Sequence, residues 1–205
     1  MARHLRLRLT GVGAMRSPRF APAGLLVEDD ARVMLDGGPG SAPDGKLDAW
    51  LVTDAHAELI GEIRRLAGQQ HLEPQVCAFH APGLDVVPLP VTHTSRPTFG
   101  YLVSTEGRRI VWAPEFLEFP VWAEGADLMF ADAAGWDRPI RFARGAGGHA
   151  ATRDVAVEAR RRGVRRLVFA HIGRPTIRAM DAGERPPFGS FGHDGQVFLP
   201  GRWRG

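Results

Sequence analysis

Four histidines lie at the ends of segments that the sequence predicts to be strands or helices. His56, His93 and His171 each follow an apolar run, and His149 comes directly before a predicted helix. Loops at strand ends are where a rigid scaffold presents reactive side chains. A single histidine there is more often structural, because its ring can simply bond a backbone carbonyl. Four in equivalent places, with acidic residues beside them, favour a metal site.

The most informative junction is "LDAWLVTDAHAELIGEIRRLA", residues 48–68. An apolar strand leads there into an amphipathic helix, and Asp54, His56 and Glu58 lie between the two. Polar side chains at such a point either begin a helix or bind a metal ion, and the segment alone allows both interpretations.

The rest of the chain contains the elements that must position these residues. Helix periodicity begins at Leu59, and a second helix is expected within 151–163, with Thr152 as its N-cap. Apolar runs and period-two alternation predict strands near residues 5–10, 23–28, 32–36, 48–53, 76–80, 85–91, 99–105, 108–114, 126–133, 165–172 and 194–200. No polar linker divides the chain, so we expect one domain over residues 1–205. Two blocks of strands, each followed by a helix, fit an α/β four-layered αββα sandwich.

Several segments resemble the metallo-β-lactamase superfamily. The stretch "TDAHAELIG" aligns without gaps with the family signature "T-H-x-H-x-D-H-x-G", and "VMLDGGPG" resembles the turn that precedes this metal loop. The matches are Thr53, His56 and Gly61, and the departures are Asp54 for His, Glu58 for Asp and Leu59 for His. "LTGVGAM" and "GHDGQVFL" are similar to the first and closing strands of the family, so the resemblance covers nearly the whole chain.

Within the superfamily, the nearest resemblance is to the phosphonate-pathway cyclic phosphodiesterases and ribonuclease Z. It rests on "THTSRPTFGYLVSTEGRRIVWAPEF" and "GGHAATRDVAVEARRRGVRRLVFAHIG". The resemblance implies the four-layered fold, His93 as a metal ligand and Glu115 as the bridging acid. It also implies that His171 is the final ligand and that His149 is a catalytic residue outside the ligand set.

The same resemblance implies how the ligands are shared. A first site would use Asp54, His56, His93 and Glu115. A second would keep Glu58, Glu115 and His171 but has Leu59, which cannot donate, in place of a histidine. We therefore expect one tight site for a divalent ion, Zn²⁺, Mn²⁺ or Fe²⁺, and a second site that is weak or absent.

These residues lead to a functional hypothesis. We expect a metal-dependent hydrolase of a phosphodiester or other small ester that uses a metal-bound water, with His149 stabilising developing charge or protonating the leaving group. Arg96 and Arg174, next to ligand histidines, would hold an anionic substrate. One alternative is a binding module that has lost turnover, in which strand-end histidines and carboxylates pair with one another. Another is a member that performs redox or biosynthetic chemistry at a single iron.

Composition and charge argue against nucleic-acid-binding, disulfide-bonded and membrane proteins. The net charge is only +3, and the 26 basic residues are scattered or interleaved with acids, so nucleic acid is not the expected partner. One cysteine, Cys77, allows no internal disulfide. The sequence contains no signal peptide pattern and no apolar run of membrane-spanning length, so we expect a cytoplasmic protein with a small anionic substrate and no membrane partner. A homodimer is left open.

Overall fold

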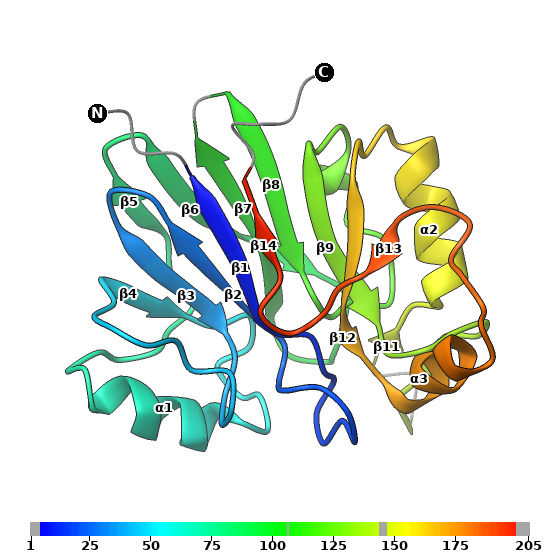
Figure 1. Ribbon diagram of the computed structural model, residues 1–205, viewed down its shortest axis with the longest axis horizontal. Coiled ribbons are helices and arrows are strands. Elements are labelled where there is room, and N and C mark those ends of the chain that lie inside the picture. Colours follow the sequence, from blue (N-terminus) through cyan, green and yellow to red (C-terminus); the bar gives the residue numbers. More distant parts are fainter. Residues whose placement is uncertain (1–4, 106, 144–146, 200–205) are drawn as a thin grey trace.

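A computed structural model describes residues 5–105, 107–143 and 147–199. Its strands form two β-sheets that pack face to face, with helices on the outer sides (Figure 1). The smaller sheet has five strands in the order β14-β1-β2-β3-β4. They are β1 (Arg6–Gly11), β2 (Gly24–Glu28), β3 (Arg32–Asp36), β4 (Ala49–Leu51) and β14 (Val197–Phe198).

The larger sheet has seven strands in the order β13-β12-β9-β8-β7-β6-β5. They are β5 (Phe79–Ala81), β6 (Leu84–Val91), β7 (Thr98–Thr105), β8 (Arg108–Ala113), β9 (Leu128–Ala133), β12 (Leu167–Ile172) and β13 (Ser190–Phe191). A separate pair consists of β10 (Ile140–Arg141) and β11 (Gly148–His149). The α/β sandwich expected from the sequence is thereby confirmed.

Period-two alternation divides the side chains of the smaller sheet between two cores. Leu25 and Val27 of β2 face the larger sheet and join the main hydrophobic cluster. Leu26, between them, faces outward and joins a second cluster with Ile63 of α1 (Ile60–Gly68). α1 therefore covers the outer face of the smaller sheet.

Two further helices cover the outer face of the larger sheet. Val155 and Ala156 of α2 (Thr152–Arg161) and Ile177 of α3 (Arg174–Asp181) belong to the main cluster. Figure 1 shows this pair on the side of the molecule away from α1. No helix among the described residues is long and apolar enough to cross a membrane.

Some local expectations were wrong. The N-cap of α2 is Ala151, and the Thr152 hydroxyl instead donates to the carbonyl of Gly135 at 2.6 Å, which ties the helix to the loop after β9. The sequence did not predict α3, a helix of eight residues whose flanks are rich in glycine and proline. It also missed the 3-10 helix at Val121–Ala123 and the two-residue strands β10, β11 and β13.

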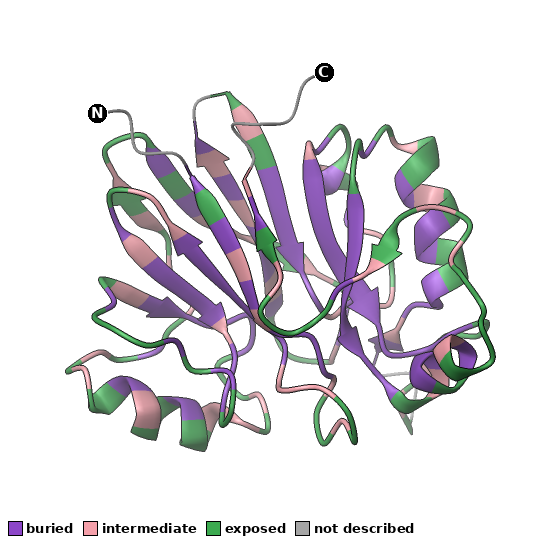
Figure 2. Cartoon of the chain, in the orientation of Figure 1, coloured by how far each residue is buried: buried purple, intermediate pink, exposed green. Residues whose placement is uncertain are grey.

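The direction of the central strands brings their ends together. β8, β9 and β12 run parallel in the larger sheet, and β3 and β4 run parallel in the smaller one. Every residue of β9 and β12 is buried, as the continuous purple of these strands in Figure 2 shows. Since buried strands leave little room for polar groups, reactive side chains are concentrated at or just after the carboxyl ends.

Asp36 joins the two sheets at this edge. It ends β3 in a left-handed backbone conformation (φ 53°). Its Oδ1 accepts hydrogen bonds from the backbone N–H and the hydroxyl of Thr53 at 2.7 and 2.9 Å, and its Oδ2 accepts one from the indole N–H of Trp112 in β8 at 2.7 Å. Burial raises the pKa of Asp36 to about 7, although the bonds from Trp112 and Thr53 oppose this shift.

Replacing Asp36 by asparagine should lower the free energy of unfolding by about 1–3 kcal/mol at pH 8. An amide presents an NH₂ group to either Thr53 or Trp112, so one enclosed donor loses its acceptor. The measurement is urea denaturation followed by tryptophan fluorescence. Asp48→Asn is the matched control, because exposed Asp48 accepts a single backbone N–H, from Arg32 at 2.8 Å, which an amide oxygen can also accept. Equal losses in both variants would contradict the prediction.

Candidate functional site

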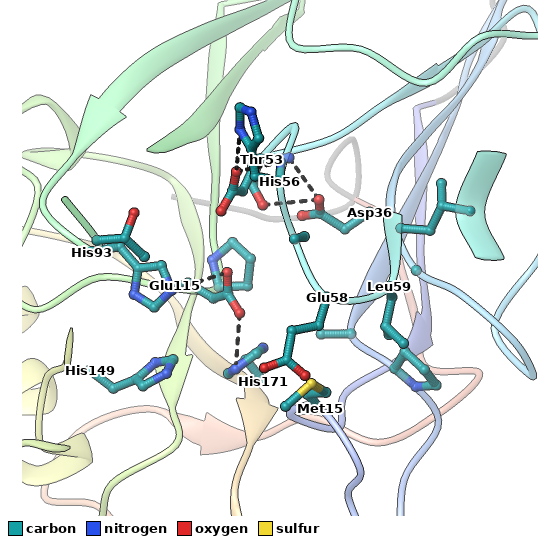
Figure 3. A pocket seen from close by; sticks show the side chains of 18 of the residues that line it. Met15, Asp36, Thr53, His56, Glu58, Leu59, His93, Glu115, His149 and His171 are labelled. Atoms are coloured by element: carbon teal, nitrogen blue, oxygen red, sulfur yellow. Dashed lines mark hydrogen bonds and ion pairs between the residues drawn. The ribbon is translucent and has the colours of Figure 1, made fainter. Parts of the chain in front are cut away.

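A cavity of about 490 Å³ lies where strands of the two sheets end (Figure 3). Its lining includes all six predicted metal ligands, the predicted catalytic histidine and one of the two predicted substrate-binding arginines. These residues are Asp54, His56, Glu58, His93, Glu115, His171, His149 and Arg96. Segments far apart in the sequence thus bring His56, His93 and His171 to one cavity.

Glu115 stands between two imidazoles. Its Oε1 lies 3.2 Å from Nε2 of His171, and its Oε2 lies 3.5 Å from Nε2 of His93. Both histidines are buried, whereas the Glu115 side chain is 22 % exposed and faces the cavity. Glu115 reaches this position directly after Pro114, which follows the last residue of β8.

The backbone fixes the tautomer of His93. Its Nδ1 lies 2.9 Å from the carbonyl oxygen of Gly148, and a carbonyl can only accept, so Nδ1–H donates. In the neutral ring, Nε2 then presents a lone pair toward Glu115. Two lone pairs facing one another are unfavourable without a proton or a cation between them. A second ring nitrogen held by a backbone carbonyl is also the usual arrangement of metal-binding histidines.

His171 adopts a left-handed backbone conformation at the end of β12 (φ 55°). Such conformations in residues other than glycine cluster at functional sites, and histidine tolerates them better than most residues. Burial lowers the pKa of His171 below its ordinary value, although the charge of Glu115 opposes the shift. The neutral imidazole is the form that binds a metal ion.

Asp132 holds His149, the third histidine beside Glu115. This fully buried carboxylate of β9 accepts the backbone N–H of Ala134 at 2.8 Å and of Phe116 at 3.1 Å. Its Oδ2 also lies 2.8 Å from Nδ1 of His149. Burial alone would lower the pKa of His149, but the charge and hydrogen bond of Asp132 raise it to about 9.

The rings of His149, His93 and His171 form a compact group. The His149 ring lies 4.7 Å from that of His93, and it stacks on His171 at 5.2 Å with only 20° between the planes.

Burial raises the pKa of Asp132, but the charge and hydrogen bond of His149 outweigh burial and hold that pKa below its ordinary value. A charged His149 thus lies beside a neutral His171.

The loop after β4 is arranged differently. Asp54 Oδ1 accepts the backbone N–H of His56 at 2.7 Å, an Asx turn, and lies 3.7 Å from His56 Nδ1. The His56 side chain is 61 % exposed and Glu58 is exposed as well. Among the described residues, no hydrogen bond or ion pair joins Asp54 or His56 to Glu115. Asp54, His56 and Glu58 thus line the cavity, with Asp54 paired to His56 rather than to Glu115.

The donor chemistry fits one divalent ion. Within residues 5–105, 107–143 and 147–199, no three His, Cys, Asp or Glu side chains already stand at metal-binding distances. The two contacts of Glu115 suit such a set, because two ligands about 2.1 Å from one ion stand roughly 3.0–3.4 Å apart, close to the 3.2 Å to His171 and 3.5 Å to His93. Three protein ligands and an open position are the usual composition of a catalytic zinc site. Leu59, which has no donor atom, lines the cavity at the position where the superfamily signature has a histidine.

The two predicted substrate-binding arginines lie in different surroundings. Arg96 is exposed and lines the cavity, and the backbone of its loop is held by Thr94, whose hydroxyl accepts the Arg96 N–H at 3.1 Å. Arg174 is the exposed first residue of α3 and is not among the described residues that line the cavity. The structure therefore gives only Arg96 access to a ligand there.

Two residues of the site are not among the predicted site residues. Asp132 lies in the apolar run 126–133, where a single carboxylate inside a continuously buried strand is itself a signal of a paired group. Asp36 lies in the motif "VMLDGGPG"; it is the one acid of β3 and lines the cavity.

Comparison with known proteins agrees with this architecture. The family model described as "Beta-lactamase superfamily domain" matches residues 45–172. The fold resembles the metallo-β-lactamase fold protein YhfI from Bacillus subtilis, with 15 % identity, a TM-score of 0.70, and coverage of 95 % of this chain and 99 % of that one. A search of curated protein sequences finds no match.

Two other solved structures represent the branch to which the sequence resemblance pointed. A diphosphatase from the PhnP family has 18 % identity and a TM-score of 0.71 over 95 % of this chain and 97 % of its own. The short form of human tRNase Z has 16 % identity and a TM-score of 0.69, with coverage of 94 % of this chain and 98 % of its own. The resemblance inferred from the motifs is confirmed, and the chain belongs to the β-lactamase superfamily domain family, with the metallo-β-lactamase fold.

Proposed function

We propose that the protein is a metal-dependent hydrolase of a small ester or phosphodiester, with one divalent ion held by His93, Glu115 and His171. The observation that carries the proposal is the convergence of two imidazole Nε2 atoms on the Glu115 carboxylate inside the cavity. Zn²⁺, Mn²⁺ and Fe²⁺ all suit a set of two imidazoles and one carboxylate. The ion would provide Lewis-acid activation of a water molecule.

The protein's own residues hold this set in place. The Gly148 carbonyl orients His93, and the left-handed turn at His171 directs that ring into the cavity. Glu115 faces both, so its carboxylate is oriented from two sides. Catalytic groups that are preorganised in this way lose little entropy when the substrate binds.

In this proposal, His149 transfers a proton. Because Nδ1 is committed to Asp132, Nε2 is the ring nitrogen that can exchange a proton with a molecule in the cavity. A carboxylate that fixes the ring and stabilises its charged form is the arrangement found in many acid–base pairs. His149 would donate to the departing oxygen of the ester, and Arg96 would contact the substrate at the rim.

One observation favours a second function. Glu115 already contacts both imidazoles. A binding module that has lost turnover, the alternative given by the sequence, would have contacts of this kind between strand-end histidines and carboxylates. Metal analysis of the untreated protein separates the candidates. About one equivalent of metal supports the hydrolase, no metal supports the module, and stoichiometric iron without hydrolysis supports redox or biosynthetic chemistry.

The wild-type protein should contain about one equivalent of Zn²⁺, Mn²⁺ or Fe²⁺ by elemental analysis and should hydrolyse bis(p-nitrophenyl) phosphate or p-nitrophenyl acetate. Glu115→Gln should weaken metal binding at least about 100-fold, because loss of even an outer-shell partner costs 10–100-fold, and should abolish hydrolysis. Glu118→Gln is the control: this exposed acid lies three residues later in the same loop and does not line the cavity. Retained metal and turnover in Glu115→Gln would refute the ligand set.

In metal-free protein, the His149 ring should titrate with a pKa of about 9 in ¹H–¹⁵N NMR spectra. Asp132→Asn removes the charge that raises this pKa and leaves burial opposed only by the charge of Glu115, so the pKa should fall. His80 offers a control, because its partner Asp85 lies 2.7 Å away on the surface, and Asp85→Asn should leave His149 unchanged.

The same pair predicts a pH dependence of stability. The pKa of His149 is raised on folding, so its contribution is complete below about pH 6.5 and is lost as the pH rises through about 9. The urea midpoint of metal-free wild type should fall between pH 7 and pH 10. A fall of the same size in Asp132→Asn would show that another group is responsible.

A further inference from the structure

Beside the polar cluster, the cavity has a wall of apolar residues. In Figure 3, Leu59 lies on the other side of Glu115 from His93 and His149. The wall consists of Met15, Pro22, Ala23, Leu59 and Ile63. We propose that this wall binds a small alkyl or aryl group, so that the substrate is an ester with an apolar part next to the bond that is cleaved. The inference rests on the proposed hydrolase function and names the kind of ester it takes.

Leu59 and Pro22 form a continuous surface. A β-carbon built on Gly38 would lie 3.2 Å from Cδ1 of Leu59 and 3.4 Å from Cβ and Cγ of Pro22, so both side chains close over this glycine. Gly38 also has a φ of 150°, which glycine adopts without strain. Leu59 packs on its other side against the cluster beneath α1, which contains Ile63. These contacts fix the position of the wall.

Met15 extends the wall to the rim. It is 38 % exposed, a high value for a methionine. Its neighbour Ala14 donates its N–H to the carbonyl of Ile172 at 3.1 Å, directly after His171. The thioether is therefore held near the polar cluster, and its flexibility lets it adapt to groups of different shape.

The loop that carries Met15 is anchored at both ends by one carboxylate. Asp194 Oδ1 accepts the backbone N–H of Val12, and Oδ2 accepts that of Ala21, each at 2.9 Å. In addition, the N–H of Gly13 donates to the Ala21 carbonyl at 2.7 Å. The wall is thus built before a ligand arrives.

The chemistry of the wall selects its occupant. Its five side chains have no nitrogen or oxygen atom, so a charged group placed against them would lose hydration without gaining a partner. Burial of an apolar group against these side chains is favourable, and each buried methylene should increase the affinity of the ligand about fourfold. The position where the superfamily signature has a histidine therefore carries a leucine that contacts substrate.

Methyl-¹³C-methionine NMR tests the wall independently of catalysis. Metal-free protein would be titrated with straight-chain primary alcohols from 1-propanol to 1-hexanol. The Met15 methyl signal should shift, and the dissociation constant should fall about fourfold per methylene. Signals of Met129 and Met180, which are not among the residues lining the cavity, should stay in place.

Two leucines provide the matched variants. Leu59 and Leu66 are both partly buried and pack against the same cluster, but only Leu59 lines the cavity. In Leu59→Asn, the dissociation constant should depend much less on the length of the alcohol than in the wild type. In Leu66→Asn, this dependence should be unchanged. An unchanged dependence in both variants, or a wild-type Met15 signal that does not shift, would overturn the inference.

A kinetic series separates this inference from the proposed function. Metal-loaded protein would be tested with p-nitrophenyl acetate, butyrate and hexanoate. Binding that depends on chain length without any hydrolysis would uphold the wall and refute the hydrolase. Hydrolysis that is independent of acyl length in wild type and Leu59→Asn would uphold the hydrolase and refute the wall.

Discussion

Burial of the central strands on both faces is the constraint that organises this protein. β9 and β12 are covered by the smaller sheet on one side and by α2 and α3 on the other, so their side chains must be apolar or fully partnered. Asp132 of β9 and His171 of β12 are the titratable residues of these strands. Asp132 satisfies the constraint with three hydrogen-bond partners, and His171, near the end of its strand, lies against Glu115. Polar chemistry otherwise has room only where the strands end, and parallel strands place those ends at one edge.

Charge within the cavity is distributed by the same burial. Asp132 stabilises a proton on His149, whereas His171, stacked on that ring, is disfavoured in its charged form. Neighbouring imidazoles thereby take opposite roles, one suited to carrying a proton and one to presenting a lone pair. The apolar wall lines the same cavity as this polar group.

Much of this arrangement could be predicted from the sequence. The long strands follow from period-two alternation and apolar runs, and the histidines could be grouped because each follows such a run. α3 could not, because eight residues between glycine and proline signals give little periodicity. The direction of side chains could not either: His56 matches the motif and Asp54 takes the place of its first histidine, but an Asx turn pairs the two with each other. Arg174 follows His171 closely in sequence, yet it begins a helix outside the cavity lining.

The anchoring of the loop between β1 and β2 affects when the site can form. Val12 and Ala21 bond to a carboxylate that lies 182 and 173 positions later in the chain. β1 also pairs with β14, which begins three residues after that carboxylate. On the ribosome, the first strand and the loop beside it must therefore wait until Asp194 and β14 have been synthesised before they reach their final positions. A nascent chain that stalls before Asp194 would expose the apolar residues of this loop to chaperones.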